Sequence, residues 1–283
     1  MDARSHSELS ARADLYLCLS RAFMTPRDPA LAQAMREVLP EDLDDLAAQL
    51  DLDIAAPLEA YRAAMRRLGD PLALLQLYSA TFLAPPTVAS INAGRYLDGA
   101  LNGGSVRAME EAYRLCGVER DEGFHDLADH VCVQLEFVGR LYAAEARWPG
   151  GEADGEPLPV AAGAFLAAYP MRWVDRFCAD LESAWSPREL PPSPYLALAR
   201  ILRQAVVCHS VVPHACPSSA VRRQAAIDRA RAKYAGRGIT HEDMARIRQK
   251  LEARGLSTGH LPAPPGLRGE PMGAASERLP DVR

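Results

Sequence analysis

The spacing of apolar residues indicates helices along almost the whole chain. Leu9, Tyr16 and Phe23 recur at intervals of seven, which places them on one face of a helix. Asp28-Pro29 and Asp70-Pro71 each put a capping side chain before a proline that suits the first helical position. No segment alternates apolar and polar residues over the length of a strand. The sequence therefore predicts an all-α fold.

The predicted helix with the clearest apolar stripe runs from about Leu127 to Trp148, and we expect it to be the longest. The stretch that follows, WPGGEADGEPLP, is rich in glycine, proline and acid, so we expect it to end the helix and not to pack. Further helices are expected on both sides of Pro170 and from Pro194 onward.

Length and composition limit the domain organisation. The 283 residues, 48% of them hydrophobic, suffice for one large domain or two small ones. We predict a single helical-bundle domain of about ten helices over residues 7–212. A basic helical appendage is expected over 213–254, and a disordered tail over 255–283, where proline and glycine are frequent.

Several features of the sequence point to a cytoplasmic protein without membrane association. No stretch approaches the roughly 18 uninterrupted apolar residues of a membrane span. The N-terminus has no basic segment followed by an apolar one, as an export signal would have. The six cysteines form no Cys-x-x-Cys pair, which is typical of reduced thiols in a reducing compartment.

Charge is divided unevenly between the body and the C-terminal end. Residues 1–216 carry 19 basic and 30 acidic side chains, whereas residues 217–283 carry 13 basic and 7 acidic ones. An acidic body repels nucleic acid and attracts cationic peptides. We therefore expect no nucleic-acid partner.

Two acids and two imidazoles occur within six residues at His125-Asp126-Leu-Ala-Asp129-His130. Such a group could bind a divalent metal or transfer protons. It is equally typical of a helix start, where carboxylates favour the positive end of the helix dipole and Asp126 can pair with His130. The enzyme alternative is a metal-dependent phosphohydrolase of the HD type that uses His125 and Asp126. That site needs an upstream histidine, and His6 is the only one.

A second alternative is a metal-binding regulatory protein that uses Cys208, His209, His214 and Cys216. Their spacing matches no common structural zinc site, so we expect no metal there. The chain also lacks the glycine-rich phosphate loops and the Gly-x-Ser-x-Gly motif of nucleotide and acyl-transfer enzymes. We therefore expect no catalytic residues and no cofactor.

The segment GFHDLADHVCVQLEFVGRLY resembles the signature of the TorD/DmsD/NarJ family of redox-enzyme maturation chaperones. Members carry an acid-x-Pro-Asp-His motif, followed on the same helix by an apolar residue and Glu-Phe. Asp126 stands at the acidic position, Asp129 and His130 match the Asp-His pair, and Glu136-Phe137 matches the later segment. Ala128 replaces the usual proline, which should alter the stiffness of the loop more than the display of side chains.

A second segment, Tyr78-Ser-Ala-Thr-Phe82 before a proline-rich loop, is similar to the Tyr-x-x-x-Phe segment of the same family. The resemblance covers about residues 9–212. It implies a non-catalytic cytoplasmic chaperone, a monomer or homodimer, that binds the apo catalytic subunit of a molybdopterin oxidoreductase and its twin-arginine signal peptide. It also implies that the client and its peptide are bound by Asp126, Asp129, His130, Glu136, Phe137, Tyr78 and Phe82, and that Tyr78, Phe82 and helix 127–148 wall an apolar groove for the peptide.

Overall fold

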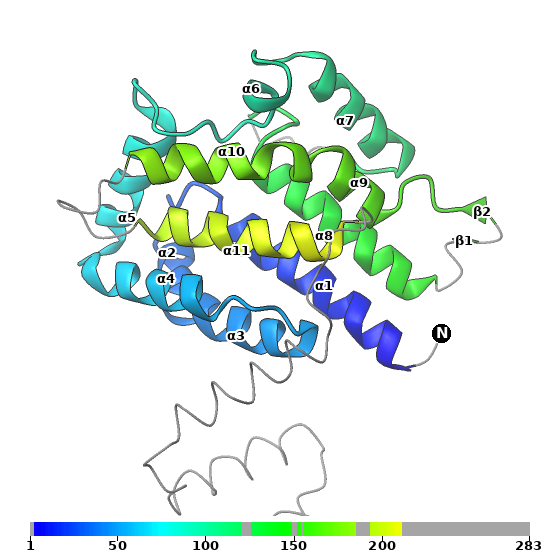
Figure 1. Cartoon of the computed structure of the whole chain (residues 1–283), viewed down its shortest axis with the longest axis horizontal. Coiled ribbons are helices and arrows are strands. Elements are labelled where there is room, and N and C mark those ends of the chain that lie inside the picture. Colours follow the sequence, from blue (N-terminus) through cyan, green and yellow to red (C-terminus); the bar gives the residue numbers. More distant parts are fainter. Residues whose placement is uncertain (1–2, 120–125, 149–151, 154–155, 185–192, 211–283) are drawn as a thin grey trace, which may run out of the picture. The chain divides into compact units, whose positions relative to one another are not determined.

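The computed structural model describes residues 3–119, 126–148, 152–153, 156–184 and 193–210 (Figure 1). The chain forms two compact units, residues 1–223 and 224–283, and all the described residues belong to the first. The described part is built from α-helices, one short π-helix and a single two-stranded hairpin, which confirms the predicted all-α fold. The predicted appendage and tail lie outside the described residues.

The elements follow one another as α1 (Ala3–Ala22), α2 (Pro29–Glu37), α3 (Leu39–Leu50), α4 (Ala55–Arg67), α5 (Pro71–Tyr78), the π-helix η1 (Ser79–Leu83), α6 (Gly94–Leu97), α7 (Gly104–Leu115), α8 (Val131–Arg147), β1 (Glu152–Ala153), β2 (Glu156–Pro157), α9 (Ala162–Ala168), α10 (Pro170–Ser183) and α11 (Pro194–His209).

Helix starts follow the local rules that the sequence suggested. The Asp28 carboxylate accepts the Ala30 backbone N–H at 2.9 Å, and the Asp70 carboxylate accepts that of Ala73 at 2.8 Å. In both cases proline occupies the first turn, where its missing N–H costs no hydrogen bond. The predicted starts at Pro170 and Pro194 are also confirmed.

Helices α1 and α8 form an antiparallel pair. His6 Nδ1 lies 3.0 Å from the Ala146 carbonyl at one end of the pair, and the Ser20 hydroxyl donates to the Cys132 carbonyl at the other end. Between them the helices approach so closely that a Cβ atom on Gly139 would lie 2.8 Å from Leu17 Cγ. Glycine is required at that crossing because any larger residue would push α1 away.

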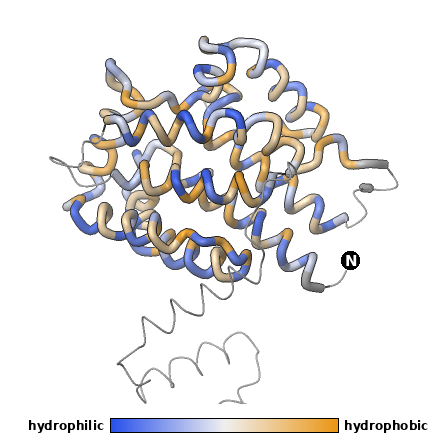
Figure 2. Tube along the Cα trace, viewed as in Figure 1, coloured by the Kyte–Doolittle hydropathy of each residue, from blue (hydrophilic) through white to orange (hydrophobic). Residues whose placement is uncertain are grey.

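Helix α11 lies between α10 and α4 and is almost entirely buried (Figure 1). Hydrophobic and hydrophilic residues alternate around the other helices, as amphipathic packing requires (Figure 2). Fully buried aromatic rings fill the centre, among them Trp173, Phe177 and Tyr195. Among the described helices, none combines the length and apolar character that crossing a bilayer would require.

Three details differ from the predictions. Helix α8 begins at Val131 and not at Leu127. The Asp129 carbonyl accepts the Ala93 N–H and the Val131 N–H donates to the Ile91 carbonyl, so these groups do not bond within a helical turn. Helix α1, with 20 residues, is longer than α8, with 17. The glycine- and proline-rich stretch after α8 contains the β1–β2 hairpin, in which residues 152–153 pair with 156–157.

Candidate functional site

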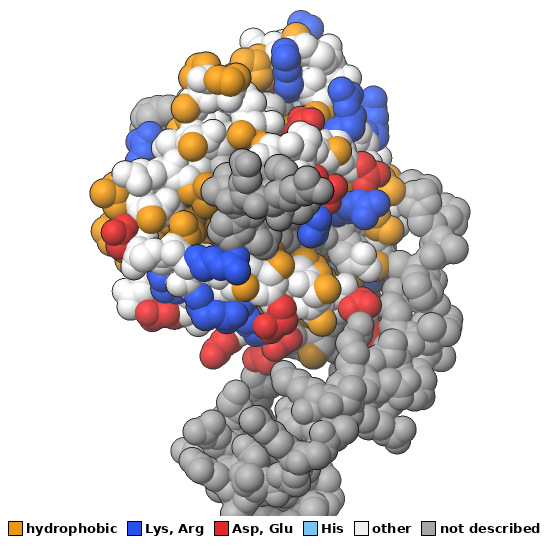
Figure 3. Space-filling model, turned by 60° about the vertical axis from the view of Figure 1, so that its left-hand side comes forward, with side chains coloured by type: hydrophobic (Ala, Val, Ile, Leu, Met, Phe, Trp, Pro, Cys, Tyr) orange, Lys and Arg blue, Asp and Glu red, His pale blue; other side chains and the backbone are white. Residues whose placement is uncertain are grey.

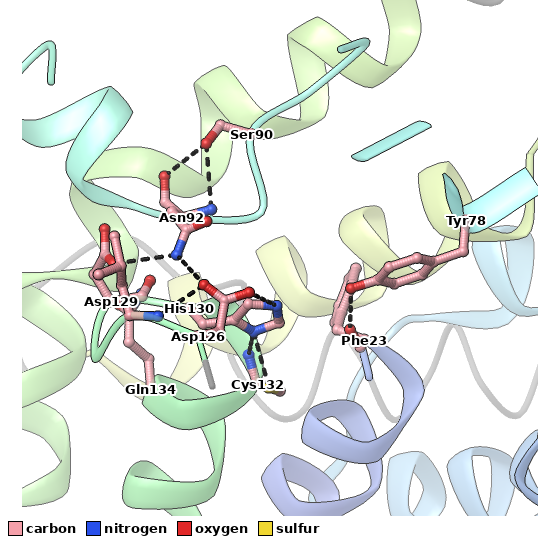
Figure 4. A network of polar contacts seen from close by, with 10 residues as sticks. Phe23, Tyr78, Ser90, Asn92, Asp126, Asp129, His130, Cys132 and Gln134 are labelled. Atoms are coloured by element: carbon pink, nitrogen blue, oxygen red, sulfur yellow. Dashed lines mark hydrogen bonds and ion pairs between the residues drawn. The ribbon is translucent and has the colours of Figure 1, made fainter. Parts of the chain in front are cut away.

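The Asp129 carboxylate is completely buried and holds two parts of the chain together (Figure 4). Its Oδ2 accepts the Gly94 backbone N–H at 2.6 Å, and its Oδ1 accepts the Asn92 amide at 3.2 Å. A buried carboxylate requires such donors, because without them its desolvation would be unfavourable. Asp129 therefore fixes the loop before α6 against the start of α8.

Backbone hydrogen bonds reinforce this contact. The Ala93 N–H donates to the Asp129 carbonyl at 3.1 Å, and the Val131 N–H donates to the Ile91 carbonyl at 3.0 Å. The Gln134 amide also donates to the Asp129 carbonyl at 2.7 Å and in turn accepts the Trp173 indole N–H at 3.1 Å. The Asp-His segment thus connects the loop, α8 and α10.

His130 is the N-cap of α8. Its Nδ1 accepts the Cys132 backbone N–H at 3.2 Å and also lies 2.8 Å from the Cys132 thiol. Its Nε2 lies 3.7 Å from Asp126 Oδ2. Burial lowers the pKa of His130 below its ordinary value of 6.5, although Asp126 and Asp129 partly oppose that shift. The imidazole is therefore neutral at pH 7, and Nδ1 serves as the acceptor that begins the helix.

Asp126 and Glu136 are the two predicted site residues that reach the surface. The Asp126 side chain is 41% exposed, and its Oδ1 accepts the Leu127 backbone N–H and the Asn92 amide. The Glu136 side chain is 49% exposed and pairs with Arg140, one turn later on α8. These two carboxylates can contact a partner directly, whereas Asp129 and His130 cannot.

The three predicted aromatic site residues lie in the core. Tyr78 and Phe82 form an edge-to-face pair with ring centroids 5.0 Å apart, and Tyr195 packs edge-on against both. Phe137 packs in the same edge-to-face manner between Tyr113 and Phe165. The prediction that Tyr78 and Phe82 wall an open groove is therefore wrong, because both rings are buried, Tyr78 at the end of α5 and Phe82 in the π-helix η1.

An open groove does exist, but it lies between α1 and α3 with one side chain from α8. Its volume is about 680 Å³, and Leu17 and Met24 stand in it with 36% and 40% of their surface exposed. We call it the acidic groove; it is lined by Asp14, Leu17, Cys18, Ser20 and Arg21 of α1, by Met24 just after α1, by Asp42, Asp45, Leu46 and Gln49 of α3, and by Glu136 of α8.

The thiol of Cys18 reports the electrostatic character of this groove. Burial, together with the carboxylates of Asp42 and Asp14, raises the pKa of Cys18 to about 11, while Arg21 opposes this shift. The groove therefore favours positive charge. Sequence analysis missed it, although a signal was present: Asp14, Cys18 and Arg21 share one face of α1 with apolar Leu17.

Figure 3 shows acidic, basic and hydrophobic side chains interspersed over one face of the molecule, without a broad patch of either charge. Exposed acids elsewhere in the described structure often pair with arginine, as in Arg62 with Glu59 and Arg200 with Glu182.

The described residues do not form the phosphohydrolase site of the enzyme alternative. His6 contacts Ala146, at the opposite end of the α1–α8 pair from Asp126, and His125 lies outside the described residues. Within the described residues, no three His, Cys, Asp or Glu side chains are grouped so as to hold a metal ion.

The second metal hypothesis involves two described residues and two that are not. The Cys208 thiol lies 3.8 Å from the Gln204 amide nitrogen, and the His209 ring lies against Tyr16 and Tyr142. His214 and Cys216 lie outside the described residues, so the expectation that this group binds no metal stays a prediction.

Comparison with known proteins gives one family match. A family model described as "Nitrate reductase delta subunit" matches residues 29–179. Among solved structures, a protein from Archaeoglobus fulgidus described as a redox enzyme maturation protein shares 16% sequence identity with this chain. That alignment covers 72% of this chain and 93% of the other, with a TM-score of 0.36, which is too low to establish a shared fold. A comparison with curated proteins finds no match.

Proposed function

Because the chain belongs to the nitrate reductase delta subunit family of NarJ/TorD-type chaperones for redox-enzyme maturation, we propose that its client is a molybdopterin oxidoreductase. The chaperone binds the apo catalytic subunit of an enzyme of the dimethyl-sulfoxide reductase family in the cytoplasm. It assists insertion of the molybdenum cofactor before export, and it acts by binding without catalysing a reaction itself.

The observation that carries this proposal is the acidic groove between α1 and α3. A twin-arginine signal peptide joins two cations to a short apolar stretch. The carboxylates of Asp14, Asp42 and Asp45 suit the cations, and the exposed side chains of Leu17 and Met24 beside them offer apolar contact. Two arginines at a partly exposed acidic surface contribute only about 1–2 kcal/mol between them, so apolar contacts set most of the affinity.

The residues that match the family motif divide into two roles in this proposal. Asp126 and Glu136 contact the client, because both carboxylates are exposed. Asp129 and His130 hold the loop and α8 in the conformation that displays those two acids. Tyr78, Phe82 and Phe137 are buried and contribute to the core on which these elements pack.

A maturation experiment tests the proposal. The catalytic subunits of molybdopterin oxidoreductases from the source organism are expressed one at a time, with and without this chain, and their molybdenum content is measured. We expect one subunit to stay largely cofactor-free unless the chain is present, and to co-purify with it in the apo form. If every subunit acquires its full molybdenum content without the chain, the proposed function is wrong.

A matched pair of variants locates the activity. Asp42→Asn combined with Asp45→Asn removes two carboxylates from the acidic groove and should reduce maturation. Asp175→Asn combined with Glu182→Gln removes two acids from α10, away from the groove, and should leave maturation unchanged.

A further inference from the structure

A second cavity, of about 280 Å³, lies on the other side of the exposed face of α8 from the acidic groove. Its walls are almost entirely apolar, and Leu115 at its edge is 50% exposed. We call it the apolar pocket; the lining residues that matter here are Leu115, Arg140, Leu141, Ala144, Trp148 and Val160. The end of the glycine- and proline-rich stretch after α8, which was expected not to pack, contributes Leu158 and Pro159 to this wall.

The two cavities meet at one ion pair on α8. Glu136 lines the acidic groove, and Arg140 lines the apolar pocket. The Arg140 guanidinium donates two hydrogen bonds to Glu136 Oε1, from Nη2 at 2.7 Å and from Nε at 3.0 Å. The two side chains are 59% and 49% exposed, so the pair stands as a ridge that separates the cavities.

We propose that groove, ridge and pocket form one site for a client segment in which paired arginines are followed by an apolar stretch. This proposal rests on the proposed function and specifies how the client is recognised. A client arginine takes the place of Arg140 on Glu136, while the apolar residues that follow it enter the pocket beside Leu115 and Trp148. Arg140 is thus a built-in competitor for Glu136.

The chemistry of the ridge explains why arginine is favoured over lysine. Glu136 already receives two N–H donors from one guanidinium, a fork that an ammonium group cannot reproduce. Exposed ion pairs of this kind are weak, so a client arginine can displace Arg140 at little cost. The order of the cavities also sets direction, because the cationic end must lie on the α1–α3 side of α8 and the apolar end on the α7 side.

Titration of the full chain with three synthetic peptides tests this proposal. One peptide carries an arginine pair before a leucine-rich stretch, the second carries a lysine pair before the same stretch, and the third carries the arginine pair before a serine-rich stretch. We expect the first to bind most tightly, the second about fivefold more weakly and the third more than tenfold more weakly.

Substitutions of Arg140 and Glu136 should change the affinity for the arginine peptide in opposite directions. Arg140→Ala should tighten binding of the arginine peptide about two- to fivefold, because it removes the competitor. Glu136→Gln should weaken it about fivefold and abolish the preference for arginine over lysine. Filling the pocket with Ala144→Phe should weaken all peptides that carry the leucine-rich stretch. The matched controls are Arg200→Ala and Glu182→Gln, which break a similarly exposed pair between α10 and α11 and should change nothing.

Several results would overturn this inference while leaving the proposed function intact. One is a client that still needs the chain for maturation although none of the peptides binds. Another is an Arg140→Ala variant whose affinity for the arginine peptide is unchanged or weaker. A third is self-association of the chain that Ala144→Phe disrupts, since it would assign the pocket to a second copy. By contrast, if every catalytic subunit acquires its full molybdenum content without the chain, the proposed function itself is wrong.

Discussion

Gly94 and Asp129 approach so closely that the Gly94 backbone nitrogen lies 2.6 Å from Asp129 Oδ2. A Cβ atom at position 94 would stand 2.8 Å from the same oxygen and 3.2 Å from the Ala100 carbonyl. The buried carboxylate can reach the backbone only because residue 94 has no side chain. The Asp-His segment is therefore a structural anchor as well as a family signature.

Gly94→Ala should destabilise the fold by about 1–3 kcal/mol, because the added methyl group forces the carboxylate off its backbone donor. Gly69→Ala is the matched control, since nothing lies within 4 Å of its added Cβ. Urea denaturation of both variants measures the free energies of unfolding. Equal stability of the two would show that the contact with Asp129 is not tight in solution.

The two aspartates of the motif should differ sharply in their effect on stability. Asp129→Ala leaves the buried Gly94 N–H without its acceptor and should cost about 2–4 kcal/mol. Asp126→Ala removes a carboxylate that is 41% exposed and should cost no more than about 1 kcal/mol. Thermal unfolding distinguishes them. If Asp126→Ala proved the more damaging, its assignment as a surface contact would be wrong.

Substitutions of core and surface residues in the candidate site should also differ in their effect on stability. Phe82→Ala empties a core position between Tyr78, Phe177 and Tyr195 and should destabilise the fold by about 3–5 kcal/mol. Glu136→Gln should leave stability within about 0.5 kcal/mol of the parent chain and act on peptide binding alone. Calorimetric melting checks the first effect. A Phe82→Ala variant that melts like the parent chain would place this ring outside the core.

His130 should make the fold sensitive to mild acid. Burial lowers its pKa below the ordinary value of 6.5, so the unfolded chain takes up a proton that the folded chain resists. Its contribution to stability is therefore full above about pH 6.5 and decreases as the pH falls through the folded pKa. His130→Asn keeps a capping acceptor but cannot titrate.

The free energy of unfolding should accordingly decrease less for His130→Asn than for the parent chain between about pH 7.5 and pH 5.5. Denaturant titrations at several pH values measure the difference. Parallel pH profiles for the two proteins would mean that other groups dominate the response to acid.

The thiol of Cys18 should alkylate slowly despite its position in an open groove. With a pKa raised to about 11 by burial, Asp42 and Asp14, little thiolate is present near pH 8. Asp42→Asn should speed alkylation, whereas Asp28→Asn, at the cap of α2, should not. Peptide-level mass spectrometry after iodoacetamide treatment measures the rates. If Asp42→Asn left the alkylation rate unchanged, this carboxylate would contribute little to the electrostatic potential in the groove.

The sequence by itself determined the helices and the family. Capping aspartates before proline and apolar residues at helical spacing act through neighbours a few positions away, so Asp28, Asp70 and Pro194 marked helix starts correctly. The motif around Asp129, His130 and Glu136 was sufficient to suggest the family that the family model confirms.

Tertiary structure decided what those motif residues do. Asp126 and Asp129 stand three positions apart, yet only Asp129 is buried. Its carboxylate packs against the backbone of Gly94, which lies 35 positions away in the chain. The same loop supplies the backbone groups that delay the start of α8 to Val131. The acidic groove draws its walls from α1, α3 and α8, which are distant in sequence. Local spacing carries no information about such contacts, because they depend on how whole helices pack against one another.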